Sequence, residues 1–299
     1  MSERDDRKKK YKRDPRATEK LIDLALKEDD GHARGALIDI LQYRGSYEVF
    51  EAARKLCESA VTKEKMLGAD ILASLGRPDR AFLEESLPIL FNLLSKELED
   101  EVLCSVVYAL GRLGDEKIVE HLVKLKNHFN EHIRSRVVSG LSGQTKQEAI
   151  DALIELSKDE IEDIRSKATF EIAMLEVDTP DIREALFQRL NERGNWILDD
   201  IHESALYGLA RRKDERVLEP LLKELHLLKE FEEDAIGWHL EDGSVIFLTF
   251  EVENFLILEA AKEFADQRLL PVLSKLQEQW GDDIEPLQEA IEACQSKPQ

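Results

Sequence analysis

The chain has 299 residues, of which 42% are hydrophobic and 35% charged, and its formal net charge is −21. This length suffices for one extended domain or two compact ones. The excess of acids argues against a general grip on nucleic acid, because phosphate binding needs concentrated Lys and Arg, and it favours attraction to basic partners.

Neither cysteine spacing nor hydropathy indicates secretion or a membrane anchor. Cys57, Cys104 and Cys294 are far apart and form no CxxC pair, so neither a disulfide framework nor a zinc knuckle is expected. No apolar run approaches the roughly 18 residues of a membrane span. The expected compartment is a reducing cytoplasm, without membrane contact.

The first 16 residues are a basic segment, with eight Lys or Arg against four acids and no apolar stretch of the kind found in secretory signals. We expect residues 1–16 to be a disordered tail surrounded by solvent. Contact with RNA or an acidic surface is the alternative.

From residue 17 to 295 the sequence repeats itself. Each repeat has an acid, a branched apolar anchor, and apolar or small residues four and eight positions later. The anchors are Ala33, Leu67, Val102, Ile133, Ile164, Ile201 and Leu256. Their spacing of 31 to 37 residues, apart from one interval of 55, predicts an α-solenoid with two helices per repeat.

The fold class predicted from these repeats is an all-α superhelix of about seven helical pairs, forming a single domain over 17–295. The second helix of each pair is expected over 33–44, 67–76, 102–113, 132–142, 163–175, 200–211 and 255–265. An amphipathic segment over about 283–294 is expected to be a C-terminal capping helix.

Residues 229–254 interrupt the repeat. Ile236 and Trp238 alternate with polar or small residues, Asp242-Gly243 is a preferred two-residue turn, and residues 245–250 are mostly β-branched or aromatic. This pattern predicts a β-hairpin insertion near 235–250. One helix over residues 244–265 is the competing interpretation.

No motif for catalysis or cofactor binding occurs: GxGxxG, GxxxxGK[ST], HExxH and GxSxG are all missing from the sequence. His128 and His132 are four residues apart, but no third ligand is visible, so we expect turn histidines rather than a metal site. The sequence predicts no catalytic residue, no metal and no cofactor, and therefore a non-enzymatic binding protein.

Clusters of acids precede several second helices. Equivalent turns of a solenoid stack along one edge, so these clusters predict a single acidic rim that binds a partner. The alternative is helix capping, for which one acid per turn is enough. The predicted rim residues are Glu99, Asp100, Glu101, Asp159, Glu160, Glu162, Asp199 and Asp200.

Two groups of aromatic residues are further candidates for partner binding. Tyr108, Phe170 and Tyr207 each lie six residues after an anchor and predict a stripe along the second helices; the alternatives are packing between repeats and a nucleic-acid groove. In the insertion, large apolar residues stand among acids, which suits recognition of a basic partner; the alternative is a cover over an apolar flank. The insertion candidates are Trp238, Glu241, Asp242, Phe247 and Phe250.

The repeat resembles the HEAT-repeat consensus of the PBS-lyase-like type, in which an Asp and an Arg near the second helix bridge adjacent repeats. Arg34, Arg134 and Arg165 directly follow anchors, and Asp163 and Asp200 precede them. The chain departs from the consensus at the Arg position of three repeats, which hold Gly68, Leu103 and His202.

The order of segments, above all "RRKDERVLEPLL" followed by "DQRLLPVL", is similar to that of bacterial HEAT-repeat proteins resembling the immunity proteins encoded beside Rhs-type polymorphic toxins. The resemblance implies a cytoplasmic, non-enzymatic protein that binds and neutralises a cognate toxin domain, expected to be basic and to target nucleic acid. The alternatives are a protein scaffold or adaptor, and a HEAT-like DNA glycosylase or bilin lyase.

Overall fold

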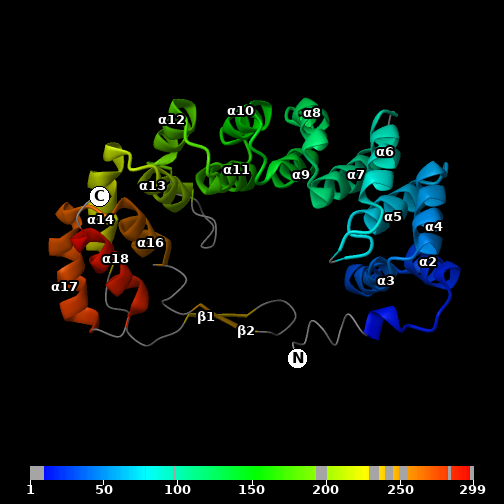
Figure 1. The fold of residues 1–299 in the computed structure, drawn as a ribbon, viewed down its shortest axis with the longest axis horizontal. Helices are drawn as coiled ribbons and strands as arrows, with labels where there is room; N and C mark the ends of the chain where they lie inside the picture. The colour runs from blue at the N-terminus through cyan, green and yellow to red at the C-terminus, as the bar shows by residue number, and fades with distance from the viewer. Residues whose placement is uncertain are drawn as a thin grey trace. The chain divides into compact units, whose positions relative to one another are not determined.

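The computed structural model describes residues 10–77, 79–96, 99–192, 201–228, 236–239, 245–248, 255–281 and 284–296. The chain divides into two compact units, residues 1–149 and 150–299. Each unit has its own core of buried Leu, Ile, Val and Ala side chains, which the helices supply at three- to four-residue spacing. Figure 1 shows the order of the elements along the chain.

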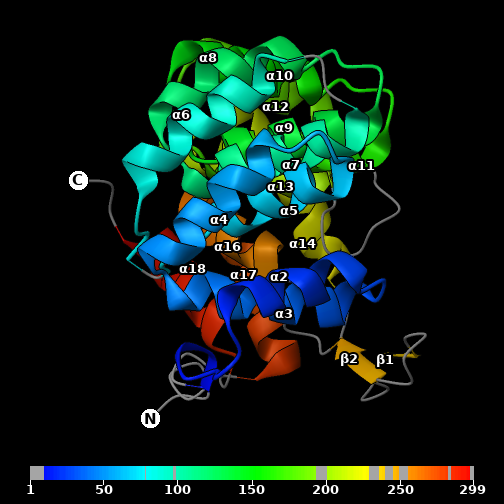
Figure 2. The ribbon, with the colours of Figure 1, turned by 90° about the vertical axis from the view of Figure 1, so that its right-hand side faces the viewer.

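In unit 1, consecutive second helices pack against one another, and the first helices form a second layer beside them. Figures 1 and 2 show this for α6 and α8, which lie on one side of α7 and α9. The first helices are α2 (Thr18–Lys27), α4 (Tyr47–Glu58), α6 (Leu83–Leu94) and α8 (Val119–Leu122), the last lying between the 3₁₀ turns η1 (Glu116–Ile118) and η2 (Val123–Leu125). The second helices are α3 (Gly31–Arg44), α5 (Thr62–Leu72), α7 (Asp100–Leu113) and α9 (Glu131–Leu141).

Unit 2 repeats this arrangement, and its second helices α11, α13 and α16 pack in sequence, followed by α18. The helix α10 (Gln147–Leu156) spans the boundary between the units. The second helices are α11 (Glu162–Met174), α13 (Ile201–Arg211) and α16 (Phe255–Phe264), and the C-terminal helix is α18 (Glu285–Gln295). The first helices are α12 (Pro180–Arg189), α14 (Leu218–Leu227) after the turn η3 (Glu215–Val217), and α17 (Leu270–Trp280) after the turn η4 (Gln267–Leu269).

All seven predicted second helices are present, within one to five residues of their expected bounds. The anchors Val102, Ile133 and Ile164 are almost completely buried. Because each occupies an equivalent position in the core, their spacing in the sequence equals the length of the structural repeat. The all-α solenoid is therefore confirmed. Its expected continuity as one domain over 17–295 remains a prediction.

Glycines permit the closest approach between successive second helices. A Cβ atom added to Gly111 of α7 would lie 2.7 Å from the Cα atom of Gly140 in α9. No side chain fits at that distance, so the two backbones pack directly against each other at this crossing.

The insertion contributes two short strands, β1 (Ile236–His239) and β2 (Val245–Leu248), which pair antiparallel with Ile236 opposite Leu248. The residues between and around the strands lie outside the described ranges. The predicted hairpin insertion over 235–250 thus stays a prediction as a whole.

Residues 11–16 pack against the end of α3. Arg44 donates hydrogen bonds to the carbonyl oxygens of Asp14 and Arg16, and the rings of Tyr11 and Tyr43 lie 5.7 Å apart. The prediction of a disordered tail over 1–16 therefore applies at most to residues 1–9, which lie outside the described residues. No helix within the described ranges combines the length and apolar character needed to cross a bilayer.

A candidate protein-binding edge

The turns before the second helices of unit 1 form a continuous edge, joined from repeat to repeat by side-chain hydrogen bonds. Thr62 Oγ1 donates to Glu99 Oε2 over 2.8 Å, and Asn130 Nδ2 donates to Asp100 Oδ2 over 2.8 Å. These bonds hold three successive turns side by side. We call this edge the unit 1 rim; it comprises residues 28–30, 61–63, 99–101 and 128–131.

Several acids of the unit 1 rim remain available to a partner. The side chain of Asp29 is 93% exposed and lies 3.8 Å from Lys63 Nζ, a distance at which the ion pair is weak. Glu101 and Glu131 are exposed and form no hydrogen bond or ion pair with any described residue. Glu99 and Asp100, by contrast, already stabilise the rim through Thr62 and Asn130, so these two predicted binding residues also have a structural role.

Two apolar side chains stand among these acids. Val61 is 53% exposed, and Phe129 is 82% exposed. Reading the sequence did not identify Phe129 as a functional residue, because it falls between the periodic positions of two helices. The sequence nevertheless contained an indication of its exposure. In "NHFNEH" a single aromatic residue stands among polar, turn-forming residues, where its side chain does not contribute to a hydrophobic core.

Of the two histidines beside Phe129, His128 lies in the turn and His132 in the first turn of α9. The backbone N–H of Asn130 donates to Nδ1 of His128 over 3.1 Å, and the backbone N–H of His132 donates to Oδ1 of Asn130 over 2.9 Å. Among the described residues no group of three or more His, Cys, Asp or Glu is arranged to hold a metal ion.

The predicted acids of unit 2 are partly engaged in shaping the turn before α11. Asp159 Oδ1 accepts from the backbone N–H of Ile161, and Arg165 donates to the carbonyl oxygens of Asp159 and Glu160. Glu162 is the first residue of α11. Asp199 and Asp200 lie outside the described residues. A single rim made of all eight predicted acids stays a prediction.

The three residues of the predicted aromatic stripe occupy equivalent positions on second helices. Tyr108 on α7 and Phe170 on α11 are each 38% exposed, and Tyr207 on α13 is partly exposed. Arg136 lies over the Tyr108 ring at 5.0 Å, and Arg211 over the Tyr207 ring at 5.7 Å. α11 and α13 are neighbours, so Phe170 and Tyr207 lie on adjacent helices. Their role in binding a partner remains a prediction.

Of the insertion candidates, Trp238 lies on β1 and Phe247 on β2. Glu241, Asp242 and Phe250 lie outside the described residues. The predicted recognition role of this segment is therefore not tested.

Two of the consensus arginines pair with an acid of the next repeat: Arg34 with Asp70 at 3.4 Å, and Arg165 with Glu192 at 2.6 Å. Arginines at this position also donate to turn carbonyls. Arg134 donates to the carbonyl oxygens of His128 and Phe129, as Arg165 does in its own repeat. Asp163 pairs with Lys167 on its own helix rather than with a neighbouring repeat. His202 takes the arginine position in α13, where its Nδ1 lies against the carbonyl oxygen of Leu190.

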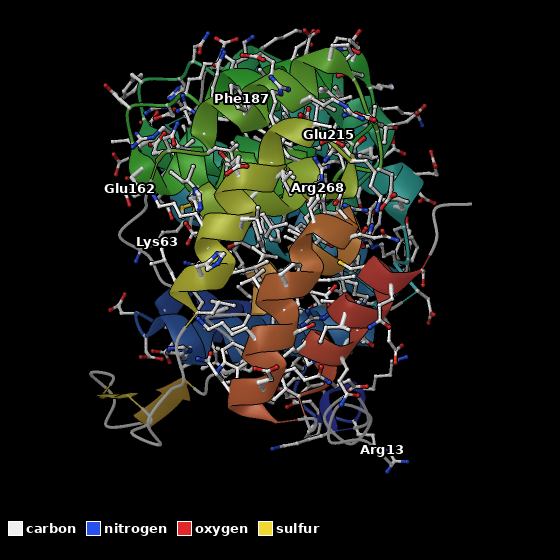
Figure 3. All side chains as sticks on the ribbon, turned by 90° about the vertical axis from the view of Figure 1, so that its left-hand side faces the viewer. Arg13, Lys63, Glu162, Phe187, Glu215 and Arg268 are labelled. Atoms are coloured by element: carbon white, nitrogen blue, oxygen red, sulfur yellow. The ribbon has the colours of Figure 1, made fainter. Side chains whose placement is uncertain are left out.

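In unit 2, ion pairs join successive repeats at the edge where the first helices begin. Arg216 reaches Glu184 over 2.9 Å. Arg268 reaches Glu215 over 2.8 Å, and both residues are labelled in Figure 3. Asp214 caps η3 by accepting from the backbone N–H of Arg216, and its bonds with the Arg216 side chain hold the pKa of its carboxyl below the usual value. This edge serves packing between repeats.

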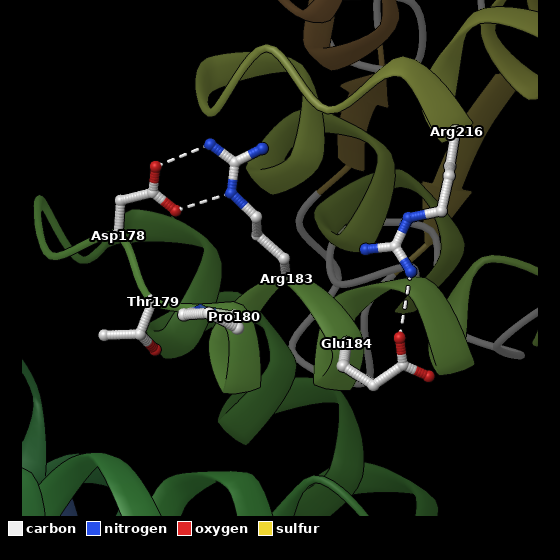
Figure 4. A pocket seen from close by; sticks show the side chains of 6 residues that line it. All are labelled: Asp178, Thr179, Pro180, Arg183, Glu184 and Arg216. Atoms are coloured by element: carbon white, nitrogen blue, oxygen red, sulfur yellow. Dashed lines mark hydrogen bonds and ion pairs between the residues drawn. The ribbon is translucent and has the colours of Figure 1, made fainter.

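A shallow cavity of about 380 Å³ opens on that edge (Figure 4). Its charged groups satisfy one another: Arg183 donates twice to Asp178, at 2.8 and 2.6 Å, and Arg216 donates to Glu184. Hydrogen bonds from Arg183 lower the pKa of the Asp178 carboxyl, which is the opposite of what a general acid at neutral pH needs. The cavity offers no group poised for chemistry.

The cysteines offer no activated nucleophile either. Burial raises the pKa of the Cys57 thiol to about 12 and that of the Cys294 thiol to about 11. Burial also raises the pKa of the Cys104 thiol. A thiol reacts as its thiolate, so all three groups are unreactive near neutral pH.

Stacked helical pairs with this periodicity define an α-solenoid built of HEAT repeats, and solenoids of this kind generally act as protein-binding scaffolds. A family model for HEAT repeats matches residues 87–173. The repeats over these residues are therefore of the HEAT type, and the chain as a whole is similar to Protein YibA of Escherichia coli strain K12. The two are 26% identical over 263 residues, which cover 85% of this chain and 82% of YibA.

Solved structures agree on the fold. The crystal structure of YibA is similar with a TM-score of 0.72 at 23% identity, covering 99% of this chain and 98% of that one. The crystal structure of an engineered protein is similar with a TM-score of 0.53 at 16% identity, covering 96% and 82% of the two chains.

Proposed function

We propose that the chain is a non-enzymatic, cytoplasmic immunity protein that binds and neutralises a basic toxin domain through the unit 1 rim. The observation that carries the proposal is that the exposed side chains of Glu101 and Glu131 share the unit 1 rim with the exposed ring of Phe129, while Asp29 is exposed farther along the same rim. Acids around an apolar centre are the anatomy of a specific site for a basic protein. The similarity of segment order to Rhs-linked immunity proteins supplies the class of partner.

The physical mechanism is steering followed by occlusion. Exposed carboxylates on a chain of net charge −21 raise the rate of encounter with a basic surface. A toxin that acts on nucleic acid must present a cationic face to phosphate. An acidic rim seated on that face competes with the nucleic acid for the same Lys and Arg side chains, and the toxin loses its substrate.

Co-expression tests the function directly. The product of the gene immediately upstream of the one encoding this chain is induced in cells with and without the chain, and survival is scored. The proposal expects death without the chain and survival with it. A harmless upstream product, or death in both cases, contradicts it. A harmless product that nevertheless binds the chain would favour a scaffold or adaptor instead.

A charge variant tests the site. In the triple variant Asp29→Asn, Glu101→Gln, Glu131→Gln, three exposed acids lose their charge without losing hydrogen bonds inside the fold. Association with the upstream protein is expected to slow by about tenfold at low salt, and by much less at high salt where charges are screened. The matched control is Glu48→Gln, Glu84→Gln, Glu85→Gln, which removes three exposed acids from the opposite edge of unit 1. Equal association rates for the two variants would place the site elsewhere.

A further inference from the structure

We propose that Phe129 is the anchor of the unit 1 rim and inserts into an apolar socket flanked by Lys or Arg on a protein partner. This inference rests on the proposed function and adds to it the residue and the kind of socket that determine how long the complex lasts.

Phe129 is the most exposed of the large apolar side chains in the described part of the chain, at 82%. A single exposed apolar residue is ordinary on a protein surface and needs no explanation by itself. What distinguishes Phe129 is the rigidity of the turn that presents it.

Buried and neighbouring groups fix both sides of that turn. Arg134, only 7% exposed, donates to the carbonyl oxygen of His128 over 2.9 Å and to that of Phe129 over 3.2 Å. Asn130, the next residue, is tied to Asp100 of the preceding repeat. The Phe129 ring also stacks on the His128 ring, with centroids 4.5 Å apart and planes inclined by 30°.

A rigid backbone matters because ordering a loop consumes part of the free energy of binding. Here five hydrogen bonds to and within residues 128–132 have already ordered the turn, so burial of the ring is gained at little entropic cost. Aromatic side chains in such positions are typical of interface hot spots, which lie at the centre of a patch with a polar surround. The exposed rim acids Glu101 and Glu131 supply that surround.

The negative charge of the unit 1 rim indicates which kind of molecule could bind around Phe129. A second copy of this chain would bring a net charge of −21 against an acidic rim, and nucleic acid would bring phosphates. Both are repelled. A protein surface with an apolar socket among Lys and Arg complements the ring and the exposed Glu101 and Glu131 together.

The test measures binding kinetics of the full chain with the upstream gene product. In Phe129→Ser we expect the affinity to fall by about 30-fold or more, as when a hot-spot residue is truncated. The dissociation rate should rise, and the association rate should stay within about twofold of wild type. Phe129→Trp, which keeps an aromatic side chain, should retain most of the affinity. The matched control is Tyr47→Ser, which removes another exposed aromatic residue, 64% exposed, at the start of α4 on the opposite edge.

Hydrogen exchange provides a second readout that does not depend on a variant. Amides of residues 128–134 should become protected when the partner binds, and those of residues 46–50 should not.

The outcomes separate this inference from the function on which it rests. If Phe129→Ser binds with wild-type dissociation kinetics, or if the 128–134 amides stay unprotected in the complex, the anchor is wrong even where the chain still rescues cells. If Tyr47→Ser weakens binding as much as Phe129→Ser, the anchor is also wrong. If the wild-type chain does not bind the upstream protein at all, the proposed function fails and the anchor fails with it.

Discussion

Arg268 in η4 donates a hydrogen bond to Glu215 in η3 over 2.8 Å and so joins the starts of two successive first helices. The same two residues belong to "DQRLLPVL" and "RRKDERVLEPLL", the segments that most clearly identify the resemblance of this chain to other proteins. The recurring motif is thus a packing device between repeats.

The Asp214 cap should matter more to stability than the ion pair of the ladder. Asp214 is nearly buried and accepts from the backbone and side chain of Arg216, whereas Glu215 and Arg268 are 72% and 51% exposed. We expect Asp214→Ala to lower the free energy of unfolding by about 1–2 kcal/mol and Glu215→Gln by less than about 0.5 kcal/mol. Urea unfolding of both variants measures this, and equal losses would contradict it.

Asp214 also predicts a pH dependence. Hydrogen bonds from Arg216 lower the pKa of its carboxyl in the folded protein below the usual value for an aspartate. A carboxyl with a depressed folded pKa stabilises the fold above its unfolded pKa, and this contribution disappears as the pH falls through the folded pKa. Unfolding followed from pH 6 to pH 2 should show stability falling below about pH 4. The loss should be shallower in Asp214→Asn, because that variant no longer has the titrating group.

Arg212 is expected to be the most sensitive charged residue of unit 2. Its side chain is 4% exposed, and its guanidinium caps the end of α11 by donating to several backbone carbonyls. The acceptors are the oxygens of Ile172, Ala173, Leu175, Val177 and Gly208. Arg212→Met leaves these oxygens buried without their donor, and we expect a loss of about 3 kcal/mol or more in the free energy of unfolding.

Arg212→Lys is the sharper variant, because it keeps the charge but cannot reach five carbonyls with one ammonium group. It should lose most of the same stability. The exposed Arg268→Ala serves as the control and should cost less than about 1 kcal/mol. If Arg212→Lys were as stable as the wild type, the positive charge, and not the planar guanidinium group, would be what stabilises the end of α11.

The sequence predicted the second helices because their anchors are buried and therefore periodic: Val102, Ile133 and Ile164 recur every 31 residues. It did not predict Phe129, since an exposed ring in a turn obeys no period. It also did not reveal the individual partners of the consensus arginines. A residue type at a fixed position does not reveal whether its side chain crosses to the next repeat, as Arg34 does toward Asp70, or turns back onto carbonyls, as Arg134 does.

The same limit applies to the acids. Their clustering before the second helices was visible in the sequence, and the structure places Glu99, Asp100 and Glu101 together on one turn. The sequence did not show which of these acids form hydrogen bonds within the protein, because that depends on the residues of the neighbouring repeats. Thr62 donates a hydrogen bond to Glu99, and Asn130 donates one to Asp100. Of the three acids, only Glu101 forms no hydrogen bond or ion pair with a described residue.

Two glycine substitutions should have effects of opposite sign. Gly111→Ala places a methyl group 2.7 Å from the Cα atom of Gly140, so α7 and α9 must move apart, and we expect a loss of about 1–3 kcal/mol in the free energy of unfolding. Gly35 lies inside α3, and a Cβ atom there meets nothing within 4 Å. Gly35→Ala should therefore stabilise the protein by about 0.5–1 kcal/mol, because alanine loses less backbone entropy on forming a helix. Thermal unfolding of the two variants beside the wild type decides the matter; a stabilised Gly111→Ala would mean that the two second helices are not in backbone contact.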